Sequence, residues 1–309
     1  MDVRQLRYFQ AIYEHGSLLA ASSHVRIATT ALGYHLAKLE AEVGRPLFDR
    51  KPRGLDPTAA GERLHDHATR ILRAIDEAVS DVRAGDGDIA GAIAVGMAYS
   101  AVKAVGVRLA KRMMADHPRL QLTLNESLSG VTLSHLMRSE VDLALVYNPP
   151  KDSRFRARPI LSERMMCVGR ADLIGPPGEP ITVAEMLTLP IILLRQGVSS
   201  GAVLREAGLL KRIESAAVLR MNSVQAISGS LRERLGCTIT TRLSVSGPVA
   251  DGTLSCRPIV EPELSRALHV CELTERPQTY AIETVRAALV SLIREAVTSG
   301  EWEADLIDA

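Results

Sequence analysis

The sequence has few aromatic residues, few cysteines and almost no net charge. Phe, Tyr and Trp make up 3% of its 309 residues, and the formal charge at pH 7 is +1. A charge this close to zero gives no bulk indication of a polyanionic partner, so nucleic-acid binding can only be predicted from local patterns. The cysteines contain no CxxC pair, which excludes a disulfide-stapled scaffold and predicts reduced thiols in the core. They are Cys167, Cys237, Cys256 and Cys271.

Long apolar segments and the common cofactor motifs are also missing. No run approaches the roughly 18 apolar residues that a membrane-spanning helix needs, and no basic segment followed by an apolar one opens the chain. We therefore predict a soluble, cytoplasmic protein without a membrane partner. The histidines form no HExxH pattern, and neither GxGxxG nor a P-loop motif occurs. These absences predict no metal, no cofactor and no enzymatic activity.

The composition is otherwise that of an ordinary folded protein. Hydrophobic residues make up 46% and charged residues 24% of the chain, which excludes disorder over its whole length. A chain this long is larger than one compact core usually organises, so two or more domains are expected. Tyr8, Phe9, Tyr13, Tyr34 and Phe48 all fall within the first fifty residues, which indicates an N-terminal module of different character.

Three short helices are predicted at the N-terminus. Apolar residues recur at spacings of three and four from residue 3 to Gly16, as expected for one buried helix face. Ser17 can cap a second helix. A third helix ends at Gly44, and its predicted buried face consists of Leu32, Leu36, Leu39 and Val43. Two short helices, a turn and a longer helix with a polar outer face are typical of a helix-turn-helix, whose last helix enters the DNA major groove.

The outer side of the third helix and the segment after it form the predicted DNA-binding surface. The candidate residues on the helix are Thr29, Thr30, Gly33, Tyr34 and Lys38. The segment that follows carries three basic residues suited to phosphate or minor-groove contact, Arg50, Lys51 and Arg53. The net positive charge of this region is small, so tight DNA binding is expected to require dimerisation.

A long amphipathic helix is predicted over residues 59–84. Thr58 can cap it, and its apolar residues alternate spacings of four and three, which is the pattern of a coiled-coil seam. The seam consists of Leu64, Ala68, Ile71, Ile75, Ala78 and Val82. We predict that it pairs two copies of the chain, and packing on its own domain alone is the alternative. A Gly- and Asp-rich hinge follows at residues 85–91.

Residues 92–309 alternate apolar strands with helices. Two successive units of this kind predict two α/β lobes with parallel strands: lobe I over 92–161 and 267–309, and lobe II over 162–266. Ligands bind beyond the carboxyl ends of such strands, where helix N-termini offer free amide groups. The candidate ligand-binding residues at these ends are Ser100, Ser129, Tyr147, Arg195, Gln196, Ser223 and Thr240. The alternative for the three serines is that each only caps a helix.

Several N-terminal motifs resemble the DNA-binding domain of LysR-type transcriptional regulators. They are Leu6-Arg7-Tyr8-Phe9, Gly16-Ser17, Leu39-Glu40 with Gly44, Pro46-Leu47-Phe48-Asp49-Arg50 and Pro57-Thr58-Ala59-Ala60-Gly61. The resemblance extends over the whole chain. It implies an α/β protein with an all-α N-terminal winged helix-turn-helix at 1–58, a dimerising linker helix, and a two-lobed effector-binding domain at 92–309 that is similar to periplasmic binding proteins.

The same resemblance implies partners and a ligand. The partners are double-stranded operator DNA and further copies of the chain in a homodimer or homotetramer, with RNA polymerase as an additional candidate. The ligand is a small anionic effector between the lobes, held by hydroxyl groups matching Ser100 and Ser129. The segments Ser129-Gly130 and Tyr147-Asn148-Pro149-Pro150 resemble the nitrogen-assimilation-control branch. Ala28 replaces the usual capping serine of the third helix, so the operator sequence is not predicted.

Two other functions are compatible with parts of the sequence. Gly197-Val198-Ser199-Ser200-Gly201 matches GxSxG, and Asp251 and His269 follow in hydrolase order, so a serine hydrolase using Ser199 is one alternative. A five-residue pattern is frequent by chance, however, and hydrolysis needs no helix-turn-helix. A solute-binding protein that is not exported is the other alternative, because the two-lobed part alone resembles one.

Overall fold

The computed structural model describes residues 1–51, 54–83, 89–194 and 207–307. The chain divides into two compact units, Met1–Gly87 and Asp88–Ala309. Some positions named in the sequence lie outside the described residues: Arg53, Arg195, Gln196, the GxSxG segment at 197–201 that contains Ser199, and part of the predicted hinge at 85–91.

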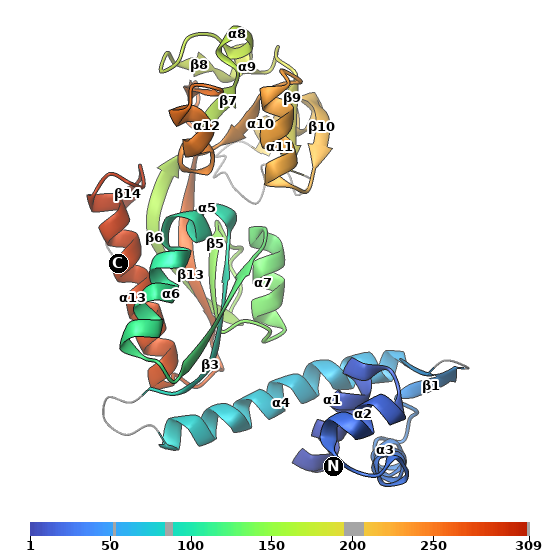
Figure 1. The fold of residues 1–309 in the computed structure, drawn as a ribbon. Coiled ribbons are helices and arrows are strands. Elements are labelled where there is room, and N and C mark those ends of the chain that lie inside the picture. The colour runs from blue at the N-terminus through green and yellow to red at the C-terminus, as the bar shows by residue number, and fades with distance from the viewer. Residues whose placement is uncertain (52–53, 84–88, 195–206, 308–309) are drawn as a thin grey trace. The chain divides into compact units, whose positions relative to one another are not determined.

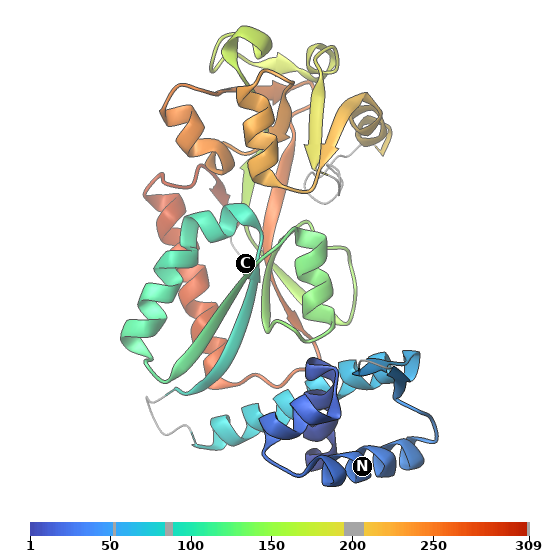
Figure 2. The same ribbon diagram turned by 45° about the vertical axis from the view of Figure 1, so that its right-hand side comes forward.

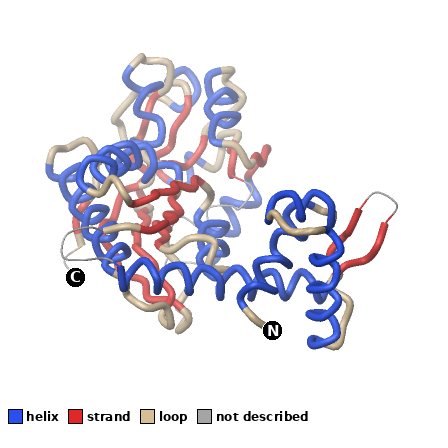
Figure 3. The backbone as a smooth tube through the Cα atoms, turned by 60° about the horizontal axis from the view of Figure 1, so that its bottom comes forward, coloured by secondary structure: helices blue, strands red, loops and turns tan. Residues whose placement is uncertain are grey.

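The first unit combines helices with a two-stranded hairpin (Figure 3). Its elements are α1 (Val3–His15), α2 (Leu18–Val25), α3 (Thr29–Val43), β1 (Phe48–Lys51), β2 (Gly54–Pro57) and α4 (Ala59–Arg83). The first three helices enclose an apolar core that includes Phe9, Leu32 and Leu39. The antiparallel β1–β2 hairpin projects from the helices as a wing. Val43, predicted on the buried face of α3, is exposed because it lies in the last turn, beyond this core.

Local capping sets the ends of these helices. The Asp2 side chain accepts a hydrogen bond from the Gln5 amide at 2.8 Å and opens α1, which ends at Gly16 in the left-handed region. The predicted cap of α2 is confirmed, since Ser17 Oγ accepts a hydrogen bond from the Ala20 amide at 3.2 Å. Gly44 ends α3 in the same left-handed conformation as Gly16.

Helix α4 begins in close contact with the helix-turn-helix. Thr58 Oγ1 accepts a hydrogen bond from the Gly61 amide at 3.1 Å, as the predicted cap requires. A Cβ atom at Gly61 would collide with the Leu47 carbonyl oxygen, so only glycine permits this approach. Ala68 and Leu72, farther along α4, are buried in the N-terminal core. Ala68 was predicted in the dimer seam, but its whole surface is already covered by its own domain.

Lobe I of the second unit is one six-stranded sheet covered on both faces. Its elements are β3 (Gly91–Met97), α5 (Tyr99–Ala101), η1 (Val102–Gly106), α6 (Val107–Asp116), β4 (Leu120–Glu126), α7 (Ser129–Met137), β5 (Leu143–Tyr147), β6 (Phe155–Arg164), β13 (Ser265–Leu273), α13 (Tyr280–Thr298) and β14 (Asp305–Leu306). The strand order is β14-β6-β13-β5-β3-β4. Figure 2 shows α6 and α13 against one face of the sheet and α7 against the other.

Lobe II contains a four-stranded sheet, β11-β7-β12-β8, and the parallel pair β9–β10. Its elements are β7 (Met166–Gly169), α8 (Ala171–Ile174), β8 (Ile181–Thr182), α9 (Val183–Met186), β9 (Ile191–Leu194), α10 (Ala207–Ala216), β10 (Ala217–Met221), α11 (Val224–Arg232), β11 (Thr238–Thr240), η2 (Leu243–Val245), α12 (Ser246–Ala250) and β12 (Ser255–Val260). A parallel bridge between Ile191 and Cys237 connects the strand pair to the sheet.

The two sheets are mixed, and this corrects the prediction of parallel strands. In lobe I, β3 is parallel to β4 and β5, but β13 is antiparallel to β5 and β6. In lobe II, β7 is antiparallel to both of its neighbours. Strands β6 and β13 form the longest antiparallel pair and run side by side in opposite directions between the lobes (Figure 1). The chain therefore crosses from one lobe to the other along two paired strands.

Candidate DNA-binding surface and interlobe pocket

The outward face of α3 carries part of the predicted DNA-binding set. Thr30, Tyr34 and Lys38 follow one another at a spacing of four, so they lie on one side of the helix, and all three are exposed. Tyr34 is an exposed large side chain, 67% accessible, on a helix whose opposite side is fully buried. These residues can reach base edges in a groove without any rearrangement of the core.

Thr29 and Gly33 lie on a different side of α3. The Thr29 hydroxyl shares a 2.9 Å hydrogen bond with the hydroxyl of Ser22, a buried residue of α2. A side chain at position 33 would point toward Leu18 at the start of α2. Because these two positions face α2, the exposed candidates for base contact on α3 are Thr30, Tyr34 and Lys38. Ala28 makes no side-chain cap, as expected.

The wing presents basic side chains and is fixed to the helix-turn-helix. Arg50 and Lys51 are exposed on β1. The Leu55 amide of β2 donates a 2.7 Å hydrogen bond to the carbonyl oxygen of Gly16, in the turn between α1 and α2. Gly54 has a φ of 145°, and a Cβ there would collide with the same carbonyl oxygen. Two glycines thus bring the wing against the turn.

The outer part of α4 has apolar residues that its own domain leaves uncovered. Ile71 and Ala78 are exposed, and Val82 is 86% exposed. Leu64 and Ile75 are half-buried, and Leu64 packs against the N-terminal core. Leu64 and Ala68, at the start of the predicted seam, therefore contribute mainly to their own domain, and the seam from Ile71 onward remains available for a second copy of the chain.

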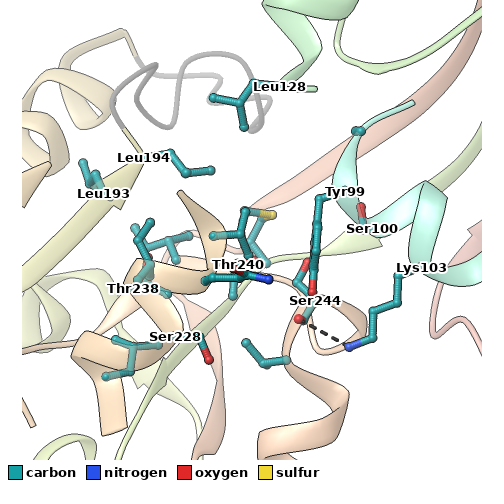
Figure 4. A pocket seen from close by; sticks show the side chains of 18 of the residues that line it. Tyr99, Ser100, Lys103, Leu128, Leu193, Leu194, Ser228, Thr238, Thr240 and Ser244 are labelled. Atoms are coloured by element: carbon teal, nitrogen blue, oxygen red, sulfur yellow. Dashed lines mark hydrogen bonds between the residues drawn. The ribbon is translucent and has the colours of Figure 1, made fainter. Parts of the chain in front are cut away.

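A cavity of about 410 Å³ lies between the two lobes. Lobe I contributes Tyr99, Ser100 and Lys103, which lie across the cavity from Leu193 and Thr238 of lobe II (Figure 4). We call this cavity the interlobe pocket. Its described lining also includes Ser127, Leu128, Ser129, Tyr147, Leu194, Val224, Gln225, Ile227, Ser228, Arg232, Ile239, Thr240, Ser244 and Arg266.

The interlobe pocket has a cationic lining. Among its described lining residues are Lys103, Arg232 and Arg266, and none is Asp or Glu. The ammonium group of Lys103 donates to the Ser244 carbonyl oxygen at 3.5 Å, which joins η1 of lobe I to η2 of lobe II (Figure 4). Partial burial lowers the pKa of Lys103 from its ordinary value. Because Lys103 belongs to lobe I and Arg232 to lobe II, an anion in the pocket would meet attractive charges from both lobes.

Two predicted residues, Ser100 and Tyr147, meet in a buried polar network. Their hydroxyl groups share a 2.7 Å hydrogen bond. The guanidinium of Arg266 lies 3.6 Å from the centroid of the Tyr147 ring, and its Nη2 donates to Ser100 Oγ at 3.0 Å. Burial raises the pKa of Tyr147 well above its ordinary value, so this phenol stays neutral.

Glu163, on β6, is the acidic member of this network. Its Oε1 accepts a hydrogen bond from Arg266 Nε at 2.7 Å, and its Oε2 accepts one from Trp302 Nε1 at 2.8 Å. Burial alone would lower the pKa of Arg266, but the carboxylate of Glu163 raises it. The result is a buried ion pair between the two strands that connect the lobes.

The other predicted pocket residues have different roles. Thr240 lines the pocket. Ser129 also lines it, but its hydroxyl accepts a 3.1 Å hydrogen bond from the Tyr147 amide and so connects α7 to β5. Ser223 is outside the described lining and caps α11 by accepting from the Ala226 amide at 3.2 Å, which is the alternative role considered for the serines. Sequence reasoning missed Arg266, although a basic residue beside an apolar strand was a visible signal.

Of the residues of the alternative hydrolase, Ser199 lies outside the described residues, and Asp251 and His269 each have other partners. Asp251 follows α12 in lobe II, where it accepts a hydrogen bond from the Thr253 amide at 2.9 Å. His269 lies on β13 in lobe I, and its Nδ1 is 3.0 Å from the Ala267 carbonyl oxygen. Within the described ranges, no cluster of three or more metal-ligating side chains occurs. The described helices also include none with the length and apolarity to span a membrane.

Two protein families match the chain. Residues 3–62 match the family described as "Bacterial regulatory helix-turn-helix protein, lysR family". Residues 86–294 match the family described as "LysR substrate binding domain". The second match alone covers more than half of the chain.

Similar proteins of known role match over nearly their full length. The nitrogen assimilation regulatory protein nac of Klebsiella aerogenes is 28% identical over 300 residues, which are 94% of this chain and 96% of that protein. The HTH-type transcriptional regulator BbuR of Bordetella bronchiseptica is 25% identical over 307 residues, 98% of this chain and 93% of BbuR.

Solved structures share the fold. A full-length OxyR variant from Pseudomonas aeruginosa has a TM-score of 0.67 at 18% identity and covers 95% of both chains. CbnR, solved in complex with its target DNA, has a TM-score of 0.66 at 18% identity, covering 96% of this chain and all of CbnR. The likeness supports the order of a helix-turn-helix followed by a two-lobed domain.

Proposed function

The chain belongs to the LysR family of transcriptional regulators, and from this premise we propose how it binds an operator and what it senses. In this proposal α3 enters the major groove with Thr30, Tyr34 and Lys38, and the wing holds the phosphate backbone with Arg50 and Lys51. The observation that carries the proposal is the outward face of α3, polar and exposed beside a basic wing that is hydrogen-bonded to the same domain.

We further propose that the effector is a small anion in the interlobe pocket. The pocket combines apolar walls from lobe II, such as Leu193 and Ile227, with cationic groups and no acidic residue among its described lining. The first residues of α7 and α11 also line it, and helix N-termini attract negative charge. No resident metal or cofactor is part of this proposal.

The proposal gives each part of the chain a task. Residues 1–58 bind DNA, 59–84 pair two copies of the chain, 85–91 act as a hinge, and 92–309 bind the effector. The working form is a cytoplasmic homodimer or homotetramer that acts on promoter DNA and contacts RNA polymerase. CbnR in complex with its target DNA supports the DNA-binding part. Relatives such as nac support a regulatory role rather than catalysis.

Removing the charges of the wing tests the DNA-binding part. We expect Arg50→Gln with Lys51→Gln to weaken binding to all DNA sequences alike, because phosphate contacts carry no base information. The slope of log affinity against log salt concentration should fall in magnitude by about two for each copy of the chain bound, since each lost phosphate contact removes about one of the counterions released on binding. Fluorescence anisotropy with a promoter fragment and a scrambled fragment measures both effects.

The control for this experiment removes the same charge elsewhere. Lys111→Gln with Arg119→Gln changes two basic residues of the second unit and should leave the salt slope unchanged. An unchanged slope in the wing variant would show that Arg50 and Lys51 make no phosphate contact. A loss confined to the promoter fragment would instead assign them to base recognition.

A further inference from the structure

Arg266 lies at the junction of the two lobes of the second unit. It lies near the start of β13, at the point where the chain returns from lobe II to lobe I. Its side chain is only 13% exposed, yet it lines the interlobe pocket. A buried cation at the junction of two lobes, open on one side to a ligand cavity, can respond to a ligand and affect both lobes.

The hydrogen bonds of Arg266 leave one edge of its guanidinium open. Nε donates to Glu163, and Nη2 lies 2.6 Å from the same carboxylate while donating to Ser100 and, at 3.3 Å, to Thr241. In the part of the chain that the structure describes, Nη1 donates no hydrogen bond. Because the two N–H groups of Nη1 point in fixed directions, this open edge offers oriented donors to carboxylate oxygens.

Neighbouring groups hold the guanidinium plane in position. Stacking on the Tyr147 ring at 3.6 Å fixes its face, and Glu163 fixes one edge. An anion therefore finds its donors already oriented, and little conformational freedom is lost on binding. The same Glu163 carboxylate repels a second anion, so the affinity of the open edge is kept moderate.

The Nη2 group of the guanidinium links the lobes. Ser100 belongs to α5 in lobe I, and Thr241 follows β11 in lobe II, and both hydroxyl groups accept from the one Nη2 atom. A ligand that draws the guanidinium toward the pocket must lengthen one or both of these hydrogen bonds. Binding at Nη1 and the contact between the lobes are therefore not independent.

We propose that Arg266 is the residue that converts anion binding into a change in lobe arrangement, with Nη1 binding the effector's anionic group and Nη2 releasing Ser100 or Thr241. This inference rests on the proposed effector site and adds Arg266 as the residue that binds the negative charge of the effector. It also assigns Glu163 as the internal competitor of the effector. Arg266 is thus a specificity-determining residue, selecting an anion over a neutral molecule of equal shape.

The test uses the full-length protein with hexanoate as the anionic probe and hexanamide as its neutral counterpart. Glu163→Gln should bind hexanoate about tenfold more tightly than the wild type, because a competing charge is lost while the hydrogen bond from Trp302 is kept. Arg266→Met with Glu163→Gln removes the buried ion pair as a whole, which spares the fold an unpaired charge, and should lose at least about tenfold in hexanoate affinity. The affinity for hexanamide should be the same in the wild type, in Glu163→Gln and in the paired variant.

A distance measurement tests the coupling. Spin labels at Tyr280 of lobe I and Leu235 of lobe II, both exposed, report the separation of the lobes in protein diluted with unlabelled copies. Hexanoate should shift this distance in the wild type and in Glu163→Gln, and should leave it unchanged in the paired variant. Lys111→Gln, which removes a positive charge outside the described lining of the pocket, is the matched control and should retain the shift.

Several outcomes would overturn the inference. Equal hexanoate affinity in the wild type and the paired variant would exclude Arg266 as the anion contact, as would the absence of hexanoate binding in both the wild type and Glu163→Gln. Binding without a change in distance would exclude the coupling. Operator binding by the wild type is measured separately. The absence of operator binding would contradict the proposed function, while the hexanoate titration would still test whether Arg266 contacts the anion.

Discussion

Replacing Ile71 by Asp is expected to separate the oligomer into monomers and to weaken binding to a two-half-site operator about a hundredfold. Ile71 is exposed on α4 on the same side as Ala78 and Val82. If two copies pair there, the new carboxylate is buried without a partner, which costs several kcal/mol. About 2.8 kcal/mol already corresponds to a hundredfold change in affinity. Light scattering measures the mass, and fluorescence anisotropy measures operator binding.

Other substitutions at the same position serve as controls. Ile71→Leu keeps an apolar side chain of equal size and should retain the parent mass. Ile71→Lys should dissociate the oligomer as Asp does, because the sign of an unpaired buried charge is irrelevant to its desolvation cost. If both charged variants kept the parent mass, the exposed part of α4 would not be the interface.

Replacing Asp142 by Ala is expected to destabilise the second unit by about 3 to 5 kcal/mol. Asp142 is fully buried and forms an ion pair with Arg276, whose side chain is also buried. Its Oδ2 accepts a 2.6 Å hydrogen bond from the Ala94 amide of β3. Alanine would remove the carboxylate partner of a buried guanidinium and the acceptor of a backbone amide in one step. Urea denaturation followed by circular dichroism measures the loss.

An exposed ion pair provides the comparison for this prediction. Asp172 pairs with Arg170 at 3.0 Å, and both side chains are well exposed to solvent. Asp172→Ala should cost less than about 1 kcal/mol, because water screens such pairs. Equal losses for the Asp142 and Asp172 variants would contradict the argument that burial makes the first pair important.

The sequence predicts the N-terminal unit well because its signals are local. Ser17, Gly16 and Gly44 act within one helical turn, so their identity is enough to predict where helices begin and end. The same holds for Thr58 at the start of α4. The seam on α4 is predicted less completely, because a repeat of apolar residues does not specify which surface covers it. Ala68 faces its own core for that reason.

Strand β6 is not predicted because its sequence lacks the residue pattern that is typical of a strand. Phe155–Arg164 contains four charged residues and a proline, so neither an apolar run nor a clean alternation is visible. Its partner β13 supplies most of the backbone hydrogen bonds that make it a strand. Tertiary pairing therefore determines this element, and with it the mixed sheet and the crossing between lobes.

The candidate site is predictable only where strand ends define it. Ser100 and Tyr147 follow or end apolar strands, so their place at the pocket follows from the order of elements. Arg266 and Glu163 are 103 residues apart, and nothing local indicates that they meet. Ser223 has the same sequence context as Ser129, yet it satisfies an amide of its own helix. A serine that caps a helix and a serine that lines the pocket look alike before the fold is known.

The hydrogen bond between the wing and the α1–α2 turn affects which DNA sequences can be bound. With Leu55 held on Gly16 and Gly54 pressed against the same carbonyl oxygen, the domain is a stiff template whose wing cannot adjust independently of its helices. Any mismatch in curvature must be taken up by the duplex. Flexible pyrimidine–purine steps accept such deformation at the lowest energy. Operators of this protein are therefore expected to show preferences at base pairs that no side chain touches.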